Sequence, residues 1–393
     1  MNVMLRYNLS YWERETFFKN FDVAVVGSGI VGLAAALHLK SMHPRLNVAI
    51  LERGVLPAGA STRNAGFACF GSMTELLDDI AHYGEDQVLT VVEKRWRGLQ
   101  RLRALVGDEN LDFQTLGGYE MFTDDEEEIF QQCRERIPDF NRKIGAITKH
   151  GEVYKQVDEL LPRFGFRGVR HLILNQPEGQ VHTGKMMAAL LRIAESQGIK
   201  IFNGIAIKRM EDSSQGVELQ TDAGWTLRVP RILIAVNAFA RTLLPDTDVT
   251  PARNQVLITH PIPNLTIEGC FHYDRGYYYF RNIDGRILLG GGRHLDNASE
   301  QTDEFGANEL IRSALVQLLK TVICPGRPVE VDAWWTGILG LGSVKKPIVE
   351  RYSENVVIAV RLSGMGVAIG TLVGQEGAEM LLKNDASRLL TSS

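Results

Sequence analysis

The hydrophobic residues near the start of the chain are arranged as in a buried strand, a helix and a second buried strand. The run Val23-Ala24-Val25-Val26 is apolar at every position, which is typical of a strand covered on both faces. A glycine-rich turn follows, and residues 30–36 are small and apolar. A second apolar run begins at Val48 and ends at Glu52. The pattern predicts one β-α-β unit over residues 23–51.

The next stretch predicts helices with one apolar face. Between residues 89 and 105, apolar side chains recur every three or four positions, as on one side of a helix. The acidic run from Asp124 to Glu128 follows a short strand at 119–122. We expect this run to begin a helix rather than to bind a metal, because acids complement the positive end of the helix dipole. A further helix is predicted at 183–197.

Strands dominate the second half of the chain. Residues 253–294 form short alternating runs rich in Tyr, with a turn at Asp284-Gly285, as in an antiparallel sheet. Near the end, the apolar strand 356–360 precedes a helix from Val367 to Leu382. Other strands are predicted at 199–202 and 231–238, with a small antiparallel excursion at 206–211 and 217–221.

Glycine spacing after the first strand is typical of a dinucleotide site. Gly27 permits the tight turn, Gly29 lets the backbone approach a pyrophosphate, and Gly32 allows close packing of helix on strand. The pyrophosphate would lie at the positive end of the helix dipole, and Glu52 could accept hydrogen bonds from ribose hydroxyls. Three glycines alone also occur in ordinary turns, but here a strand, a helix and an acid surround them.

Together the patterns predict an α/β protein with two domains. A Rossmann-like nucleotide-binding domain is expected to be built from three chain segments, with an inserted α+β domain that contains the antiparallel sheet. The expected boundaries are 1–80, 150–245 and 336–393 for the nucleotide-binding domain, and 81–149 and 246–335 for the inserted substrate domain.

Composition narrows the classes of protein. The net charge of −4 argues against nucleic-acid binding, which depends on clustered positive charge. No apolar run approaches the roughly 20 residues that span a bilayer, and the charged residues among positions 1–20 argue against a secretory leader. A helix is expected at Tyr11-Trp12-Glu13-Arg14, packed on the domain surface. The four cysteines have no spacing for zinc or a disulfide framework, so we expect buried thiols and a cytoplasmic protein.

Five segments in order resemble the flavin-dependent D-amino-acid oxidase superfamily, which includes glycine oxidase, sarcosine oxidase and γ-glutamylputrescine oxidase. The first is the glycine fingerprint, and the second is Gly59-Ala60-Ser61-Thr62-Arg63-Asn64-Ala65-Gly66, similar to the family's GAS-x-RN-x-G. The others are Leu233 to Ala238, with Asn237 in place of a glycine, the segment Asp284 to Gly291, and the turn Gly364-Met365-Gly366-Val367. The resemblance covers nearly the whole chain after residue 20.

The resemblance implies FAD rather than NAD, and it implies which residues hold this cofactor. Non-covalent attachment is expected, because the stretch Ile338 to Gly342 lacks the cysteine to which sarcosine oxidase links its flavin. The turn before Val367 would direct a helix dipole at the flavin ring. The expected cofactor-binding residues are Gly27, Gly29, Ile30, Val31, Gly32, Glu52, Arg53, Ser61, Thr62, Arg63, Asn64, Ala65, Gly66, Ala206, Asn237, Gly364, Met365, Gly366 and Val367.

In the resembled family, a hydride moves from the carbon next to an amine nitrogen to flavin N5, and the resulting imine is hydrolysed. Reduced flavin then passes its electrons to oxygen or another acceptor. The expected substrate is therefore a small amine or amino acid. Glycine oxidase binds the substrate carboxylate through an arginine in a W-x-G-x-R segment, but here Leu339 stands at that position, in Trp335-Thr336-Gly337-Ile338-Leu339.

Other residues must therefore anchor a carboxylate, or the substrate has none at that point. The candidate anchors are Tyr278, Arg281, Arg293 and Arg361. Each has a structural alternative: Tyr278 could pack within its sheet, Arg281 and Arg293 could be solvated at strand ends, and Arg361 could form a structural salt bridge.

Two other functions are compatible with parts of the sequence. An NAD-dependent dehydrogenase would use the same glycine fingerprint, but it would leave the 61–66 loop and the Gly364 turn unexplained. A non-catalytic flavoprotein is compatible with the loss of an arginine at Leu339. The sequence names neither the substrate, the electron acceptor nor the oligomeric state.

Overall fold

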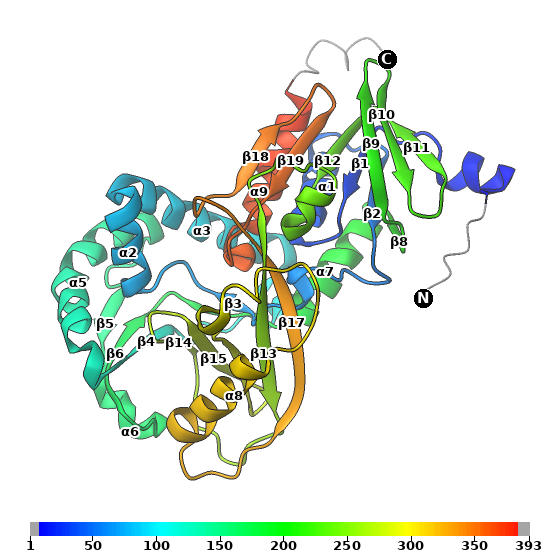
Figure 1. Ribbon diagram of the computed structural model, residues 1–393. Coiled ribbons are helices and arrows are strands. Elements are labelled where there is room, and N and C mark those ends of the chain that lie inside the picture. The colour runs from blue at the N-terminus through cyan, green and yellow to red at the C-terminus, as the bar shows by residue number, and fades with distance from the viewer. Residues whose placement is uncertain (1–7, 384–393) are drawn as a thin grey trace. The chain divides into compact units, whose positions relative to one another are not determined.

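A computed structural model describes residues 8–383, which fall into two compact units (Figure 1). Within the described residues, unit 1 comprises 8–62, 184–251 and 339–383, and unit 2 comprises 63–183 and 252–338. As expected, one unit is built from three segments and the other is inserted into it. The sequence-based boundaries differ from this division, because residues 63–80 and 150–183 lie with unit 2.

Unit 1 contains a six-stranded sheet with the order β18-β19-β12-β1-β2-β8. Neighbouring strands are parallel except for β18, which pairs antiparallel with β19 at one edge. Every residue of β1, β2 and β19 is buried, as their continuous apolar runs predict. The strands are β1 (Val23–Val26), β2 (Val48–Glu52), β8 (Lys200–Asn203), β12 (Arg231–Ile234), β18 (Ile348–Arg351) and β19 (Val356–Val360).

Two helices of unit 1 pack closely because small residues line their contact. These are α1 (Ile30–Met42) and α9 (Gly366–Leu382), blue and red in Figure 1. A Cβ atom on Gly370 would lie 2.7 Å from Cγ2 of Ile30, and one on Gly374 would lie 2.5 Å from the carbonyl oxygen of Val31. Both helices are largely buried. The close approach brings the N-terminal halves of α1 and α9 together.

The remaining elements of unit 1 lie outside this central pair. A three-stranded antiparallel sheet, ordered β11-β10-β9, packs its apolar face into the same core as β12 and β19. Its strands are β9 (Ile207–Ser213), β10 (Gly216–Thr221) and β11 (Thr226–Val229), and the long helix is α7 (Thr183–Ser196). Short helical turns are η1 (Glu13–Phe17), η2 (Ala60–Thr62) and η5 (Asn237–Thr242).

Unit 2 is built on an eight-stranded, mostly antiparallel sheet with the order β17-β13-β16-β15-β14-β4-β6-β5. Strands β14 and β4 pair in parallel within it. A separate two-stranded ladder pairs β3 with β7. The strands are β3 (Phe67–Ala68), β4 (Gly118–Thr123), β5 (Tyr154–Gln156), β6 (Val169–Asn175), β7 (Gly179–Gln180), β13 (Thr250–Thr259), β14 (Cys270–Tyr273), β15 (Tyr278–Ile283), β16 (Arg286–Gly291) and β17 (Val331–Leu341).

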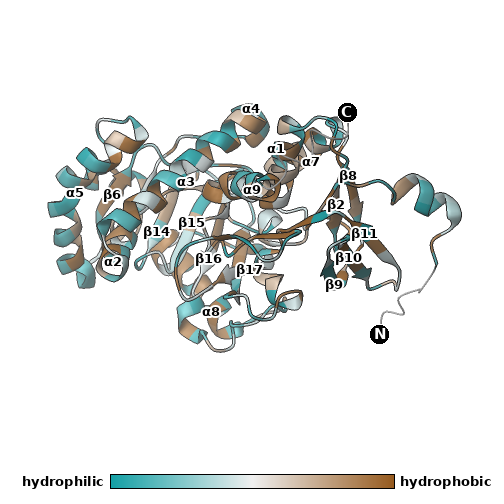
Figure 2. Ribbon diagram, turned by 90° about the horizontal axis from the view of Figure 1, so that it is seen from above, coloured by the Kyte–Doolittle hydropathy of each residue, from teal (hydrophilic) through white to brown (hydrophobic). Residues whose placement is uncertain are grey.

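Helices cover this sheet with their apolar sides, and both hydropathy colours appear along α3 and α5 in Figure 2. The helices are α2 (Met73–Tyr83), α3 (Glu85–Val106), α4 (Asp108–Leu111), α5 (Glu127–Thr148), α6 (Leu161–Phe164) and α8 (Glu309–Leu318), with the turns η3 (Asp124–Glu126), η4 (Asp158–Leu160), η6 (Arg293–Asp296) and η7 (Leu319–Ile323). Between residues 8 and 383, no helix has the length and apolarity needed to cross a membrane.

Most predicted elements are confirmed, with two exceptions. The strand expected at 231–238 ends at Ile234, because Asn237 adopts a left-handed conformation (φ 45°) and begins the turn η5. The helix near Tyr11 forms, but Tyr11 and Trp12 do not pack on the domain surface and are 60% and 72% exposed. All four cysteines are free and buried, as expected.

The acidic run 124–128 does begin a helix. Thr123 and Glu126 form a reciprocal capping box at the start of η3, and α5 continues from Glu127. A second acid caps a helix from outside its own segment. Buried Glu120 on β4 accepts hydrogen bonds from the N–H groups of Met73 and Thr74 at the start of α2, and from the Thr74 hydroxyl.

Replacing Glu120 by glutamine is predicted to stabilise the protein at alkaline pH. Burial raises the pKa of Glu120 from 4.5 to about 7, so between these values the folded state binds more protons than the unfolded state. The free energy of unfolding therefore falls as the pH rises through this window. Above it, the full cost of burying the ionised Glu120 carboxylate is present. The neutral amide removes this cost, which corresponds to about 3 kcal/mol.

Urea unfolding at about pH 5 and about pH 8.5 checks this, with the exposed Glu159→Gln as the matched control. The gain of Glu120→Gln over the wild type should be larger at the higher pH, and the control should show no such difference. Equal effects at both pH values would contradict the prediction.

Candidate functional site

The glycine turn after β1 has no space for side chains. Gly27 adopts φ 105°, and a Cβ atom there would lie 2.8 Å from the carbonyl oxygen of Ala235. A Cβ atom on Gly32 would lie 2.0 Å from the carbonyl oxygen of Gly27. Glycine is therefore required at both positions, and the backbone of the turn stays open toward the N-terminus of α1.

Glu52 lies directly beside this turn. Its Oε2 accepts hydrogen bonds from the backbone N–H of Ser28 at 3.0 Å and from the Ser28 hydroxyl at 2.7 Å. Its Oε1 accepts from the N–H of Gly54 at 2.9 Å. These bonds fix the carboxylate at the end of β2 next to the fingerprint. Glu52 is buried, with 6% of its surface exposed. Sequence reasoning placed Glu52 here but missed Ser28, whose position between two fingerprint glycines gave no signal of its role.

The turn η2 brings Ser61 to the start of α1. The Ser61 hydroxyl accepts a hydrogen bond from the N–H of Ile30 at 2.9 Å, and a Cβ atom on Gly29 would lie 3.0 Å from the same oxygen. Thr62 steadies the turn by donating to the carbonyl oxygen of Pro57 at 2.6 Å. Two segments that are thirty residues apart therefore meet at one helix N-terminus.

The turn before α9 forms the third part of the site. Gly364 has φ 82° and Ser363 has φ 47°, so the chain reverses sharply before α9 begins at Gly366. Asn237 supports this turn, since its Oδ1 accepts from the N–H of Leu362 at 3.1 Å. The D-amino-acid oxidase superfamily that the sequence resembles has glycine where Asn237 stands. Asparagine tolerates the left-handed backbone found here. Because α9 packs on α1, Val367 and Met365 lie at the same end of unit 1 as the glycine turn.

Two further predicted residues of unit 1 lie around β2. The guanidinium carbon of Arg53 lies 3.6 Å from the centroid of the Phe239 ring, which is the geometry of a cation–π contact. Ala206 follows β8, and its carbonyl oxygen accepts from the N–H of Asp222 at 2.9 Å. The neighbouring Ile205 donates to the carbonyl oxygen of Glu52 at 2.8 Å, which holds this segment next to the end of β2.

Arg361 forms the salt bridge that was the alternative to a substrate anchor. Its Nη1 pairs with Asp248 Oδ2, and its Nε donates to the carbonyl oxygen of Lys346 at 2.8 Å. The side chain is 6% exposed, and Gly342 leaves room for it, because a Cβ there would lie 2.3 Å from Arg361 Cδ. These contacts give Arg361 a structural role within unit 1.

In unit 2, the loop 63–66 is held by a network from distant strands. Trp335 Nε1 donates to the carbonyl oxygen of Arg63 at 3.0 Å, and Arg63 Nη1 donates to the carbonyl oxygen of Thr336 at 3.0 Å. Asn64 Oδ1 accepts from the N–H of Gly66 at 2.8 Å and from the Thr183 hydroxyl at 2.9 Å. Hydrogen bonds therefore fix both parts of the GAS-x-RN-x-G segment: the part up to Thr62 in unit 1 and the part from Arg63 in unit 2.

Arg281 belongs to this network rather than to a solvated strand end. It is 2% exposed, its Nε donates to the carbonyl oxygen of Ala65 at 2.5 Å, and its Nη2 donates to that of Val181 at 3.1 Å. Burial lowers the pKa of its guanidinium. Arg281 thus positions the loop 63–66, a role that its sequence context did not indicate.

The remaining anchor candidates are Tyr278 on β15 and Arg293 at the start of η6. Tyr278 on β15 is 9% exposed and packs edge-on against the His294 ring at 5.3 Å. Arg293 Nη1 donates to Asn297 Oδ1 at 2.8 Å, and burial lowers the pKa of the guanidinium. Burial raises the pKa of the Tyr278 hydroxyl, which therefore stays protonated.

An aromatic group on the sheet of unit 2 was not predicted. Phe67 contacts the rings of His272 at 5.3 Å and Tyr279 at 5.6 Å, and Tyr279 packs with Trp335 in one apolar cluster. Burial lowers the pKa of His272 to about 4 and raises that of Tyr279 to about 12, so both side chains are neutral near pH 7. The alternation of residues along β14 and β15 is the sequence signal that places His272 and Tyr279 on one face.

Comparison with known proteins identifies the family. The chain is 25% identical to gamma-glutamylputrescine oxidoreductase of Escherichia coli over 93% of its length and 84% of that protein. It is 26% identical to glycine oxidase of Geobacillus kaustophilus over 93% of the chain and 94% of the relative. The fold is similar to the crystal structure of iminodiacetate oxidase from Chelativorans sp., with a TM-score of 0.75, 20% identity, and coverage of 92% and 95%.

A match to a family model extends over segments of both units. The profile of the DAO family, described as FAD dependent oxidoreductase, matches residues 22–380. This range includes the glycine turn, the 61–66 loop and the turn before α9. The match supports FAD and gives no support to a nicotinamide cofactor. The chain therefore belongs to the DAO family of FAD-dependent oxidoreductases, which act on amines and amino acids.

Proposed function

We propose that this chain oxidises the C–N bond of a small amine or amino acid with an FAD that is bound non-covalently by unit 1. The observation that carries the proposal is the meeting of three separated segments at the N-terminus of α1. Gly27 and Gly32 have no room for Cβ atoms, Ser61 bonds to Ile30, and α9 packs directly on α1. Backbone N–H groups at a helix N-terminus after such a turn suit a pyrophosphate.

Each part of unit 1 suits a different part of the cofactor. The fingerprint residues Gly27 to Gly32 would hold the pyrophosphate through backbone N–H groups. Glu52 would accept hydrogen bonds from ribose hydroxyls, because its three donors already fix both oxygens without occupying all of their lone pairs. Arg53 and the backbone of Ala206 would lie toward the adenine end, as the family resemblance implies.

The N-terminus of α9 supplies electrostatic support. The positive end of its dipole favours negative charge in front of Met365, Gly366 and Val367. Bound FAD supplies a hydride acceptor for the carbon next to the amine nitrogen. The protein's own task is to fix the geometry of this end of the site, and Asn237 does so by bonding to Leu362.

Non-covalent binding is supported by the positions of the cysteines. The stretch Ile338 to Gly342 contains none, and the four cysteines present are buried. Cys69 is the cysteine nearest in sequence to the 61–66 loop, and its burial makes it a poor nucleophile toward a flavin.

The substrate proposal follows from which arginine side chains already bind other groups of the protein. Leu339 cannot bind a carboxylate, Arg361 pairs with Asp248, and Arg281 binds two backbone carbonyl oxygens. Tyr278 and Arg293 therefore remain as the proposed substrate-contacting residues. The aromatic side chains Phe67 and Tyr279 are neutral, so they favour a substrate whose amine is uncharged over a substrate that needs a further charged partner.

The proposed activity is tested by anaerobic reduction of the flavin. We expect at least one member of a panel of amines and D- and L-amino acids to bleach the flavin absorbance of the purified protein. Amines without a carboxylate next to the reacting carbon should be better substrates than glycine. A flavin-loaded protein that none of the panel reduces would instead support a non-catalytic flavoprotein.

Gly29→Asp is predicted to abolish flavin retention. The new side chain meets Ser61 Oγ, which lies 3.0 Å from the Cβ position, and it adds a negative charge where the pyrophosphate would lie. The ratio of flavin to protein absorbance measures retention, and Gly151→Asp, in open space in unit 2, is the control. A fully loaded Gly29→Asp protein would show that the cofactor lies elsewhere.

Arg361→Ala is predicted to affect stability more than chemistry. Removing the buried guanidinium leaves the Lys346 carbonyl without its donor and takes one partner from Asp248, which keeps its bonds from Ser343, at a cost of about 2 kcal/mol. In the loaded fraction, the rate of flavin reduction by an active amine should stay within about two-fold of wild type. Thermal unfolding and stopped-flow reduction test this. A slower reduction with normal stability would restore Arg361 as a substrate anchor.

A further inference from the structure

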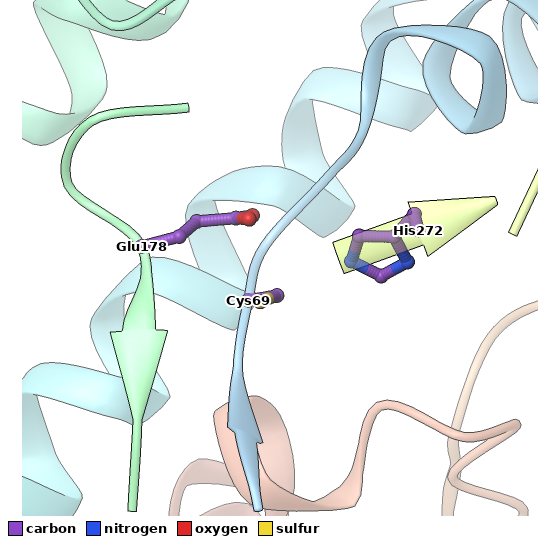
Figure 3. Close-up of side chains that lie close together, drawn as sticks. All are labelled: Cys69, Glu178 and His272. Atoms are coloured by element: carbon purple, nitrogen blue, oxygen red, sulfur yellow. The ribbon is translucent and has the colours of Figure 1, made fainter. Parts of the chain in front are cut away.

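A cluster of three metal-ligand side chains lies inside unit 2. Cys69 follows β3, Glu178 precedes β7 and His272 lies on β14 (Figure 3). One ligand atom from each residue lies within 4.8 Å of the other two. Sequence spacing could not predict the cluster, because its members are separated by about a hundred residues each.

Backbone contacts fix the position of the Glu178 carboxylate. Its Oε1 accepts hydrogen bonds from the N–H groups of Phe70 at 2.6 Å and Gly71 at 3.0 Å. The other oxygen, Oε2, would lie 1.9 Å from a Cβ atom on Gly118, so only glycine at this position makes room for it. The ladder pairing Ala68 with Gly179 holds the segments of Cys69 and Glu178 side by side.

A small cavity adjoins the cluster. Its volume is about 10 Å³, close to the space that one ordered water needs, and Glu178, His272 and Asn175 are among its lining residues. Asn175 Oδ1 and His272 Nε2 are buried and have no hydrogen-bond partner among the described residues. Asn175 is only 3% exposed, and its Nδ2 is already bonded to the Gly71 carbonyl oxygen. The two side chains that carry these unpaired atoms therefore both line a space of water size.

We propose that Cys69, Glu178 and His272 bind one Zn²⁺ ion, with a water molecule in this cavity as the fourth ligand. Thiolate, imidazole and carboxylate are the ligands that zinc takes in proteins, and three of them plus a water complete a tetrahedron. Asn175 Oδ1 would accept a hydrogen bond from the bound water, which satisfies its unpaired acceptor. The Phe67 ring, which contacts the His272 ring, limits its rotation.

The charges of the site balance. Loss of the Cys69 thiol proton to solvent gives a thiolate, and with the Glu178 carboxylate it neutralises the two charges of the ion. The buried cation Arg95 does not compete, because its Nη1 is paired with Glu75 Oε1 at 2.9 Å. Coordination changes no oxidation state, so it requires no oxidant or reductant.

The ion would join three segments of unit 2 that are far apart in sequence. A metal that binds the folded state alone stabilises it. The proposed flavin chemistry assigns no role to these three residues, and zinc content is measured without turnover, so this test is independent of the proposed function.

Zinc analysis of the full-length, flavin-loaded protein from zinc-supplemented cells tests the proposal. We expect about one zinc per chain in the wild type. Cys69→Ala and His272→Ala should lower this content at least about ten-fold. Cys133→Ala is the matched control, since Cys133 is equally buried in unit 2 but lies outside the cluster, and it should keep its zinc. Flavin content and thermal unfolding show which variants fold.

Glu178→Gln keeps the proposal testable if the alanine variants do not fold. Its amide oxygen can still accept the bonds from Phe70 and Gly71, but an amide is a poor zinc ligand. Protein grown with Co²⁺ in place of zinc should show tetrahedral cobalt bands in the red, beyond flavin absorption, and these should vanish in Cys69→Ala. A metal-free wild type, or zinc that survives both Cys69→Ala and Glu178→Gln, would overturn the proposal.

Discussion

The close approach of backbone to backbone at the first turn of α1 is the constraint on which unit 1 depends. Because Gly32 lies on the carbonyl of Gly27, helix α1 starts directly at the end of β1 and directs its free N–H groups into the turn. The same tight packing recurs where Gly370 and Gly374 of α9 meet α1. Small residues thus bring two helix N-termini to one end of the sheet, where two positive dipole ends can act on one anionic ligand.

Local patterns predicted β1 and its glycine turn because both depend on residues close in sequence, whereas the packing of α9 on α1 joins residues more than three hundred positions apart. The strand from Val23 to Val26 is apolar throughout, and the glycines after it meet the steric demand of a turn that the same segment makes. The hairpin at Asp284-Gly285 was predictable for the same reason, since both residues adopt positive φ. Where the backbone deviates locally, as at Asn237 after β12, the apolar run alone overestimated the strand.

Partners far apart in sequence could not be predicted in this way. Arg281 was interpreted as a charge at a strand end, yet it lies buried and binds the carbonyl oxygens of Ala65 and Val181. The same holds for Arg361 and Asp248, which are separated by more than a hundred residues. A buried guanidinium needs acceptors, so the sequence predicts that a partner exists but not which one. The assignment of substrate anchors was therefore the weakest part of the sequence analysis.

The interior of unit 2 shows how such long-range polar contacts constrain what a site can do. Glu120 and Glu178 both lie in the sheet core and both accept backbone N–H groups, from the start of α2 and from the segment after β3. Acids at these positions cost free energy through desolvation, which raises the pKa of each carboxyl group. A hydrophobic residue would fill the same space without that cost but would leave the N–H groups unpaired. For Glu178, whose second oxygen lies beside Cys69 and His272, a bound cation would offset the cost of burial that the hydrogen bonds leave.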